Sequence, residues 1–497
     1  MDKKEKREKI IDFLVFILIF FYILSIIFLK PINDLDELWN YNFARNIKEG
    51  LIPYKDFNII ITPLLSIICG GILKLTFNEL IIMRILASFL CSTIFFIIYK
   101  LFRKLNFKKE IIIIFVFFIG YLLFDVFCID YNYATLLLVM LIIYREIIDY
   151  QKNNQFLKVE IRDDILLGIL AGVSFSIKQT SGLLICISLL GNKLLFAKNK
   201  EEVKIFLRSF IYRLIGIIIP VFLLLMYLLF NGAFLEFISY TISGISEFNN
   251  IVPYKSLIKL DLIGLLSILV PLIIIYSWIK SVIFEKDKNI YILLVYGLAN
   301  FIICFPISDK IHFLIGVMPI IIILLYETYN LFIKLYKKVT KYRIIEFIMN
   351  FFAAFIILFL ICNSFINFRF YYNNRNTYST LNHYRYIIID QEVEERIKKI
   401  DKYITENKNV KILDASATLY MIPIDRYNKD YDMFNKGNFG KNGEARLIDE
   451  IAQSQNTIYL ILNDKYSKNW QTPINIINFV KENKIKTGEI DIYDIYE

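Results

Sequence analysis

The chain has 497 residues, of which 57% are hydrophobic, 16% aromatic and only 21% charged. Together with a mean hydropathy of +0.53, this composition excludes a water-soluble globular protein and a disordered one. Uncharged runs of Ile, Leu and Phe approach or exceed the ~20 residues that cross a bilayer, so we expect a polytopic α-helical membrane protein.

The net charge of +10 is unevenly distributed. Residues 369–497 hold 19 basic and 19 acidic residues, so the whole excess lies in residues 1–368. This pattern is typical of cytoplasmic loops that follow the positive-inside rule, and it argues against a nucleic-acid partner.

The N-terminal segment is basic and precedes an apolar run at about 10–30. The run is too long for a signal-peptide core and is predicted to be an uncleaved first span. The N-terminus then stays inside, and residue 31 emerges on the outer face.

Residues 57–76 decide the orientation of everything that follows. As a second span, they would place the basic cluster at 103–109 outside; as an interfacial helix, they would place it inside together with the later basic loops. Pro63 and the Gly70-Gly71 pair weaken a straight span, so the interfacial interpretation is preferred. The later basic loops are 145–162, 198–204, 280–288 and 334–343.

The resulting topology has about eleven spans and sends the C-terminal region to the outside. They are predicted at 10–30, 80–101, 110–128, 132–149, 164–178, 182–197, 209–231, 259–283, 289–305, 311–333 and 345–367. The membrane domain is thus 1–368, with a first external loop at 31–79.

Residues 369–497 differ in kind from the rest. Helical patterns alternate with strand-like ones such as VKILDASA and NTIYLILN, which predicts a small extracytoplasmic α/β domain. Helices are expected at 390–406, 444–453 and 473–484, and strands at 410–417 and 456–463.

The first external loop opens with Asp34, Asp36 and Glu37 ahead of a helix expected at 36–49. Asp34 and Glu37 have capping-box spacing, which accounts for those two acids structurally. Asp36 has no such role. A carboxylate at the membrane edge is partly desolvated, which raises its pKa and suits it to take a proton from a hydroxyl.

Other charged residues are expected near the same outer level. Asp125 and Asp130 end the third span, where capping of the next helix is the structural alternative. Lys178 and Arg84 suit a phosphate, although snorkelling to the interface would also explain them. His312, in SDKIH, is a weaker candidate for the same ligand.

Two segments of the first loop resemble a known family. DELWNYNFARNIKEGLIPYKDF, at 36–57, and TPLLSIICGGILKLTFNELIIMRIL, at 62–86, resemble the first external loop of GT-C membrane glycosyltransferases. The closest comparison is glycosyltransferase family 39, the protein mannosyltransferases and lipid A aminoarabinose transferases. Later segments (DYNYATLLL, GILAGVSFSIKQTSGLL and PISDKIHFLIGVMP) extend the resemblance to about residue 340.

The resemblance implies an inverting enzyme of the cell membrane that transfers a sugar from a polyprenyl-phosphate carrier to a cell-envelope glycan, lipid or polymer on the outer face. By position, Asp36 is the catalytic base and Glu37 supports it. Asp130, or else Asp125, forms a second acidic site for the acceptor or a cation. By the chemistry of the leaving group, Lys178, Arg84 and His312 are the candidates for the carrier phosphate.

Two departures from the family stand out. The Lys-Pro-Pro-Leu run of the aminoarabinose enzymes is only Thr62-Pro63-Leu64 here, which puts the donor-phosphate contact at that place in doubt. The lectin-like domains of eukaryotic protein mannosyltransferases are absent. Metal use is left open, since Asp36 and Glu37 are compatible with Mg²⁺ or Mn²⁺ as well as with proton transfer.

Two other classes of function compete with an enzyme. A transporter or flippase should show ionisable residues or broken helices near the bilayer midplane and an internal repeat, and the sequence shows neither because the candidate residues lie at the outer edge. A non-catalytic scaffold would use the C-terminal domain to bind a partner and would tolerate Asp36→Asn.

Overall fold

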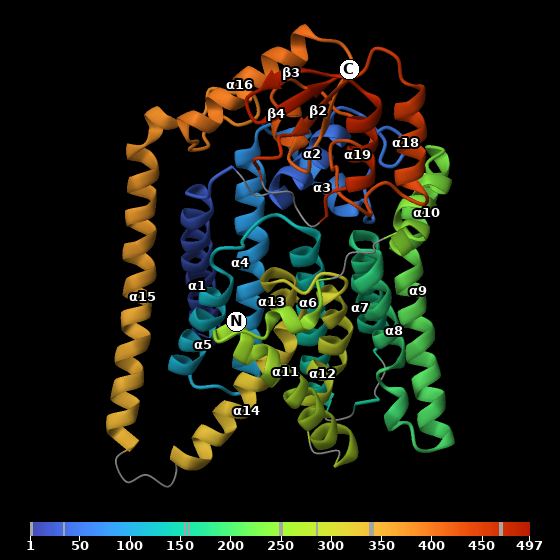
Figure 1. Ribbon diagram of the computed structural model, residues 1–497. Coiled ribbons are helices and arrows are strands. Elements are labelled where there is room, and N and C mark those ends of the chain that lie inside the picture. Colours follow the sequence, from blue (N-terminus) through green and yellow to red (C-terminus); the bar gives the residue numbers. More distant parts are fainter. Residues whose placement is uncertain are drawn as a thin grey trace. The chain divides into compact units, whose positions relative to one another are not determined.

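The computed structural model describes residues 3–32, 35–153, 156–157, 160–247, 252–284, 287–336, 342–466 and 471–497. Helices dominate the chain up to residue 373, as the apolar runs predict (Figure 1). These helices are α1 (Lys3–Phe28), α2 (Leu35–Lys48), α3 (Leu64–Leu75), α4 (Leu80–Lys104), α5 (Lys109–Leu123), α6 (Tyr131–Asn153), α7 (Ile161–Ile177), α8 (Gln179–Gly191), α9 (Lys200–Phe230), α10 (Phe234–Thr241), α11 (Leu262–Trp278), α12 (Lys288–Phe301), α13 (Lys310–Gly316), α14 (Met318–Tyr336) and α15 (Tyr342–Asn373).

Eight helices in the described part of the chain are long and apolar enough to cross a membrane. They confirm a helical membrane protein. However, fewer helices among the described residues meet this criterion of length and hydropathy than the eleven membrane spans that the sequence predicts. Three of the expected spans fall on shorter helices, since α5 has 15 residues, α7 has 17 and α12 has 14. The eight are Glu5–Phe28, Leu80–Lys104, Tyr131–Lys152, Gln179–Phe196, Lys200–Phe230, Leu262–Ile283, Met318–Leu335 and Arg343–Asn373.

The segment that decides the topology contains one short helix. α3 has 12 residues, or about 18 Å at 1.5 Å per residue, against a hydrocarbon core of about 30 Å. Its outward side is apolar, because Ile68 is 47% exposed and Leu75 is 87% exposed. A short helix with an uncovered apolar side is typical of a membrane interface, which supports the interfacial interpretation of 57–76.

The chain divides into two compact units, each built from separate stretches of sequence. The first comprises Met1–Ile27, Ala87–Leu223 and Val252–Phe368, and the second comprises Phe28–Leu86, Leu224–Ile251 and Arg369–Glu497. The first external loop therefore groups with the C-terminal region. The predicted domains, 1–368 and 369–497, remain a prediction.

In the first unit, glycines bring helices close together. A Cβ on Gly168 of α7 would lie 2.2 Å from the carbonyl oxygen of Arg213 in α9, and one on Gly172 would lie 2.5 Å from that of Ile217. Because lipid supplies little hydrophobic drive between helices, small residues that permit such packing stabilise membrane bundles. α7 turns directly into α8 at Lys178, and Gly182 of α8 packs against the backbone of Phe175.

In the second unit, the C-terminal region forms the expected α/β structure. Strand β1 pairs with β2 in parallel, whereas β4 pairs with β2 and β3 antiparallel, in the order β1-β2-β4-β3. All five predicted elements are confirmed, and α17, β3 and β4 are additional. The elements are α16 (Gln391–Glu406), β1 (Val410–Leu413), α17 (Ala417–Met421), α18 (Gly443–Gln453), β2 (Ile458–Leu462), α19 (Ile474–Asn483), β3 (Lys486–Ile490) and β4 (Tyr493–Tyr496).

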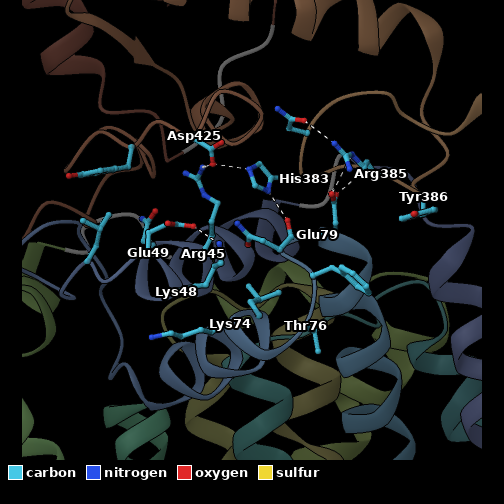
Figure 2. A pocket seen from close by; sticks show the side chains of 17 residues that line it. Arg45, Lys48, Glu49, Lys74, Thr76, Glu79, His383, Arg385, Tyr386 and Asp425 are labelled. Carbon is cyan, nitrogen blue, oxygen red and sulfur yellow. Dashed lines mark hydrogen bonds and ion pairs between the residues drawn. The ribbon is translucent and has the colours of Figure 1, made fainter.

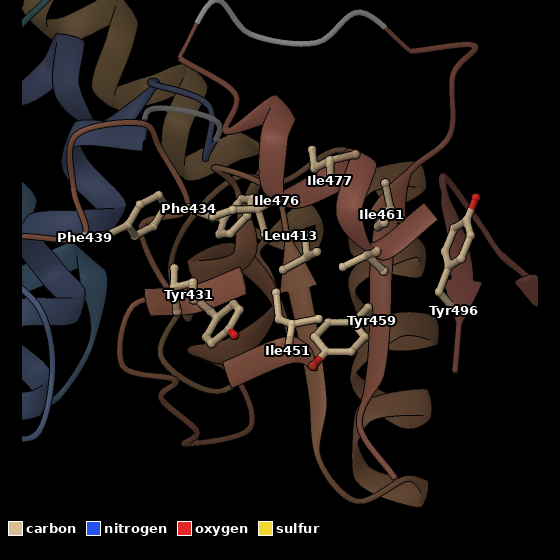
Figure 3. Close-up of a cluster of buried hydrophobic side chains, with 12 residues drawn as sticks. Leu413, Tyr431, Phe434, Phe439, Ile451, Tyr459, Ile461, Ile476, Ile477 and Tyr496 are labelled. Atoms are coloured by element: carbon tan, nitrogen blue, oxygen red, sulfur yellow. The ribbon is translucent and has the colours of Figure 1, made fainter. Parts of the chain in front are cut away.

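This sheet has a hydrophobic core of its own (Figure 3). Leu413 and Ile461 project from the two parallel strands towards Ile451 of α18 and Ile476 of α19. All four side chains are at most 1% exposed, which is the burial that gives a small α/β layer its stability.

Candidate functional site

Helix α2 begins at Leu35, one residue before the Asp36-Glu37 pair, so both acids lie in its first turn. The two side chains meet different surroundings. Asp36 is half-buried, whereas Glu37 is only 1% exposed. Asp34, the proposed capping residue, lies outside the described residues, so the capping box is not tested.

Glu37 is held by Arg84, the residue expected at the start of the next span. Arg84 Nε and Nη2 each donate to a different carboxylate oxygen of Glu37, both at 3.0 Å. Nη1 donates to the carbonyl of Lys30 at 2.8 Å, and Nη2 also donates to that of Pro31 at 3.2 Å. Arg84 is fully buried, so its guanidinium joins the segment that follows α1 and the start of α2 to α4.

The C-terminal domain contacts the other side of α2 within the same unit. Trp39 Nε1 donates to the carbonyl of Ala415, just beyond β1, at 3.3 Å. Arg45, 2% exposed, donates to the carbonyls of Ile422 and Arg426 at 3.2 and 2.7 Å. The helix that carries Asp36 is therefore positioned by residues almost 400 positions away in the sequence.

The acidic pair does not fit a divalent cation. Mg²⁺ and Mn²⁺ prefer several oxygen ligands, yet both oxygens of Glu37 accept from Arg84. No group of three or more His, Cys, Asp or Glu side chains suited to a metal occurs among the described residues. We therefore derive no step through a metal at Asp36.

The first unit contains a second cluster at the start of α6. Asp130 is 3% exposed and accepts from the backbone amide of Asn132 at 2.7 Å, so the capping interpretation is confirmed for this residue. Lys178 Nζ, at the α7–α8 turn, donates to Asn132 Oδ1 at 2.5 Å and lies 5.2 Å from the ring centroid of Tyr131. Asn132 thus forms hydrogen bonds with both Asp130 and Lys178.

Capping does not use the whole Asp130 carboxylate. Its Oδ2 is buried without a hydrogen-bond partner within the described ranges. Burial raises the pKa of Asp130, and the amide of Asn132 and the charge of Lys178 lower it in part. An acid with one unsatisfied oxygen beside a cation is suited to bind a hydroxyl.

His312 lies in α13, which packs against α6, the helix that Asp130 caps. Its Nδ1 lies 2.9 Å from Oδ1 of Asp309, which caps α13. Asp125, by contrast, is exposed and forms a surface ion pair with Lys310 at 2.7 Å. The structure therefore brings Asp130, Lys178 and His312 together and sets Asp125 in a surface pair.

No family model and no curated protein matches this sequence. The resemblance to GT-C glycosyltransferases thus stays a prediction, and the site must be judged on its own geometry.

Sequence reasoning missed a buried ionic network at the opposite ends of the helices that carry Asp130 and Lys178. Arg213 of α9 donates to Glu146 and to Asp164, each at 2.7 Å, and to Asn192 at 2.9 Å. All four residues are at most 5% exposed. Little signal was available in the sequence, because Glu146, Asp164 and Arg213 lie in helices that carry other charged residues as well.

Proposed function

We propose that this protein is an inverting glycosyltransferase that uses a polyprenyl-phosphate-linked sugar on the outer face of the cell membrane. The proposal rests on the different surroundings of Asp36 and Glu37. Glu37 is buried against Arg84, while its neighbour Asp36 stays half-buried at the start of the same rigid helix. One acid positions the helix and the other is placed to act as a base.

The proposed step involves the Asp36 carboxylate, the hydroxyl group of an acceptor and the lipid-linked donor sugar. The Asp36 carboxylate takes the proton of an acceptor hydroxyl as its oxygen attacks the anomeric carbon of the donor sugar. The bond from that carbon to the phosphate oxygen breaks, and the electron pair leaves with the polyprenyl phosphate. Attack opposite the leaving group inverts the anomeric centre.

We propose Lys178, and not Arg84, as a phosphate ligand. Arg84 is fully buried and donates to Glu37, Lys30 and Pro31. Lys178 is half-buried at the turn between α7 and α8, and His312 lies in α13, which packs against α6. Within the first unit, the oxygen of Asp130 that capping leaves unsatisfied is suited to accept a hydrogen bond from a hydroxyl group.

The test is the envelope glycan composition of a deletion strain complemented with wild type or Asp36→Asn at matched membrane levels. We expect wild type to restore a missing sugar and Asp36→Asn to reduce its transfer by about 10²-fold or more, as for loss of a general base. Asp449→Asn, the same change at an exposed carboxylate of α18, is the matched control and should restore fully. Equal restoration by Asp36→Asn would refute the assignment.

The buried network of Arg213, Glu146 and Asp164 supports a second candidate, a transporter of an amphipathic substrate, since ionisable residues inside membrane bundles often mark transport routes. Its charges are paired, however, and most of its members lie close to helix ends, which favours a structural role. Substrate accumulation in vesicles that fails with Arg213→Met, while glycan composition stays normal, would favour the transporter.

A further inference from the structure

The second unit contains a cavity of about 970 Å³ that the proposed chemistry does not use. Its walls are the C-terminal end of α2, the segment that follows α3, and two loops of the C-terminal domain at 382–386 and 425–427 (Figure 2). The volume lies within the range of ligand-binding pockets.

Hydrogen bonds between its walls hold this pocket in shape. His383 bridges the two sides, with Nδ1 at 2.7 Å from the carbonyl oxygen of Asn78 and Nε2 at 2.8 Å from Oδ1 of Asp425. The backbone amide of Arg385 donates to Glu79 at 3.1 Å. Because these bonds join the first external loop to the C-terminal domain, the pocket is preformed within this unit (Figure 2).

Two donors that line the pocket lack partners. Arg45 Nε and Asn46 Nδ2 are buried with no hydrogen-bond acceptor in the part of the chain that the structure describes. Both side chains are 2% exposed, and Arg45 is fixed through its other nitrogens by Ile422 and Arg426. A buried N–H without an acceptor is costly, so these groups point to a ligand that supplies oxygen atoms.

The charges of the lining are almost balanced. Three acids face four bases, so the pocket is not the cationic cradle that a phosphate group selects. Hydroxyl groups both donate and accept hydrogen bonds, and they match a mixed lining of this kind. The acids are Glu49, Glu79 and Asp425, and the bases are Arg45, Lys48, Lys74 and Arg385.

Three aromatic side chains at the pocket are exposed. Phe77 is 75% exposed, Tyr386 is 56% exposed and Tyr427 is 43% exposed. Exposed rings beside fixed polar groups suit a ligand with an apolar face and polar edges, since the face of an aromatic ring carries partial negative charge and attracts C–H groups. A sugar ring has both features.

We propose that this pocket binds a glycan through Arg45, Asn46 and the three aromatic rings. That the bound glycan is the acceptor rests on the proposed glycosyltransferase function, whereas the binding itself does not. The pocket at Arg45 and Asn46 is thus the proposed site, and a glycan is its proposed ligand.

The test is photocrosslinking in cells. Benzoylphenylalanine replaces Tyr427 at the pocket or, as a matched control, Tyr466, which is 45% exposed and lies outside the lining. After irradiation, we expect a periodate-oxidisable carbohydrate adduct on the protein with the probe at 427 and none with the probe at 466. A phospholipid adduct without carbohydrate, adducts at both positions, or none at either would overturn the proposal.

A second variant keeps this result separate from catalysis. Crosslinking at 427 in an Asp36→Asn background should give the same adduct, because binding does not need proton transfer. Tyr386→Ala, an exposed change, should lower the adduct yield at least fivefold, and an unchanged yield would contradict the role of the rings. An adduct that persists although Asp36→Asn transfers sugar normally would refute the proposed base and leave the glycan pocket intact.

Discussion

At the scale of single residues, the Glu37–Arg84 pair is the most constrained contact of the first external loop. Two parallel hydrogen bonds join side chains that are 1% and 0% exposed. Removing one partner of such a pair leaves a buried charge and costs about 3–5 kcal/mol, whereas replacing both with apolar residues is often close to neutral.

We therefore expect Arg84→Met and Glu37→Met each to lower the stability of the protein by about 3 kcal/mol or more, and the double variant to recover most of that loss. Thermal unfolding in detergent measures all three. If Arg84 instead serves mainly as a ligand for phosphate, Arg84→Met alone will leave the unfolding temperature unchanged, and the double variant will show no recovery.

Asp401 gives the protein a pH dependence that can be measured outside the membrane. It lies on the buried side of α16, is 8% exposed, and its Oδ1 lacks a partner among the described residues. Burial raises its pKa to about 8 from an ordinary value near 3.9. The folded state therefore keeps a proton that the unfolded chain loses, and stability falls as the pH rises from about 4 to 8.

Asp401→Asn removes this loss. We expect the stability of the variant relative to wild type to rise by about 3–4 kcal/mol between pH 5 and pH 8, since one pKa unit corresponds to about 1.4 kcal/mol. Unfolding temperatures at both pH values provide the measurement, with Glu406→Gln at the exposed end of α16 as the control. A difference that is the same at pH 5 and pH 8 would rule out titration of Asp401 as its cause.

At the scale of elements, the packing of α2 on α3 sets the position of the proposed base. Gly70 makes this packing possible, because a Cβ at that position would lie 2.8 Å from the carbonyl oxygen of Ala44 and 3.0 Å from the side chain of Ile47. The adjacent Gly71 has no atom within 4 Å of the corresponding position. Neighbouring glycines of one helix thus meet opposite constraints.

Gly70→Ala should separate the two helices and lower stability by about 1–3 kcal/mol through overpacking. Gly71→Ala should stabilise the protein by about 0.5–1 kcal/mol, because alanine is the better helix former and nothing obstructs it. Unfolding temperatures and sugar transfer by both variants test the pair. Similar effects at the two positions would contradict the close approach of α2 and α3.

Local patterns predicted most elements, for physical reasons. Periodicity and caps are short-range, so α2, the closing glycine Gly50 with its φ of 88°, and five elements of the C-terminal domain followed from the sequence. The partners of buried polar groups did not. Arg84 is 47 residues from Glu37, and the two carbonyl groups that accept from Arg45 are more than 370 residues away, so no local pattern could show these contacts.

At the scale of the whole molecule, the proposed function depends on orientation, since a lipid-linked donor and an envelope acceptor meet only on the outer face. The positive-inside rule and the shortness of α3 favour a cytoplasmic Lys104 and an external C-terminal domain. Both Lys104 and Lys441 are exposed. Of the six native cysteines, five are buried and Cys362 is exposed within an apolar helix, so Cys362→Ser gives a clean background for labelling.

On that background, Lys441→Cys should react with a membrane-impermeant maleimide in intact cells, and Lys104→Cys should react only after the cells are permeabilised. The two positions serve as controls for each other, because both are exposed and differ only in the predicted side of the membrane. Reaction at 104 in intact cells would make 57–76 a crossing segment in spite of its short helix. It would also reverse the orientation of every later helix and move Lys178 and His312 away from the face where a polyprenyl-linked donor is used.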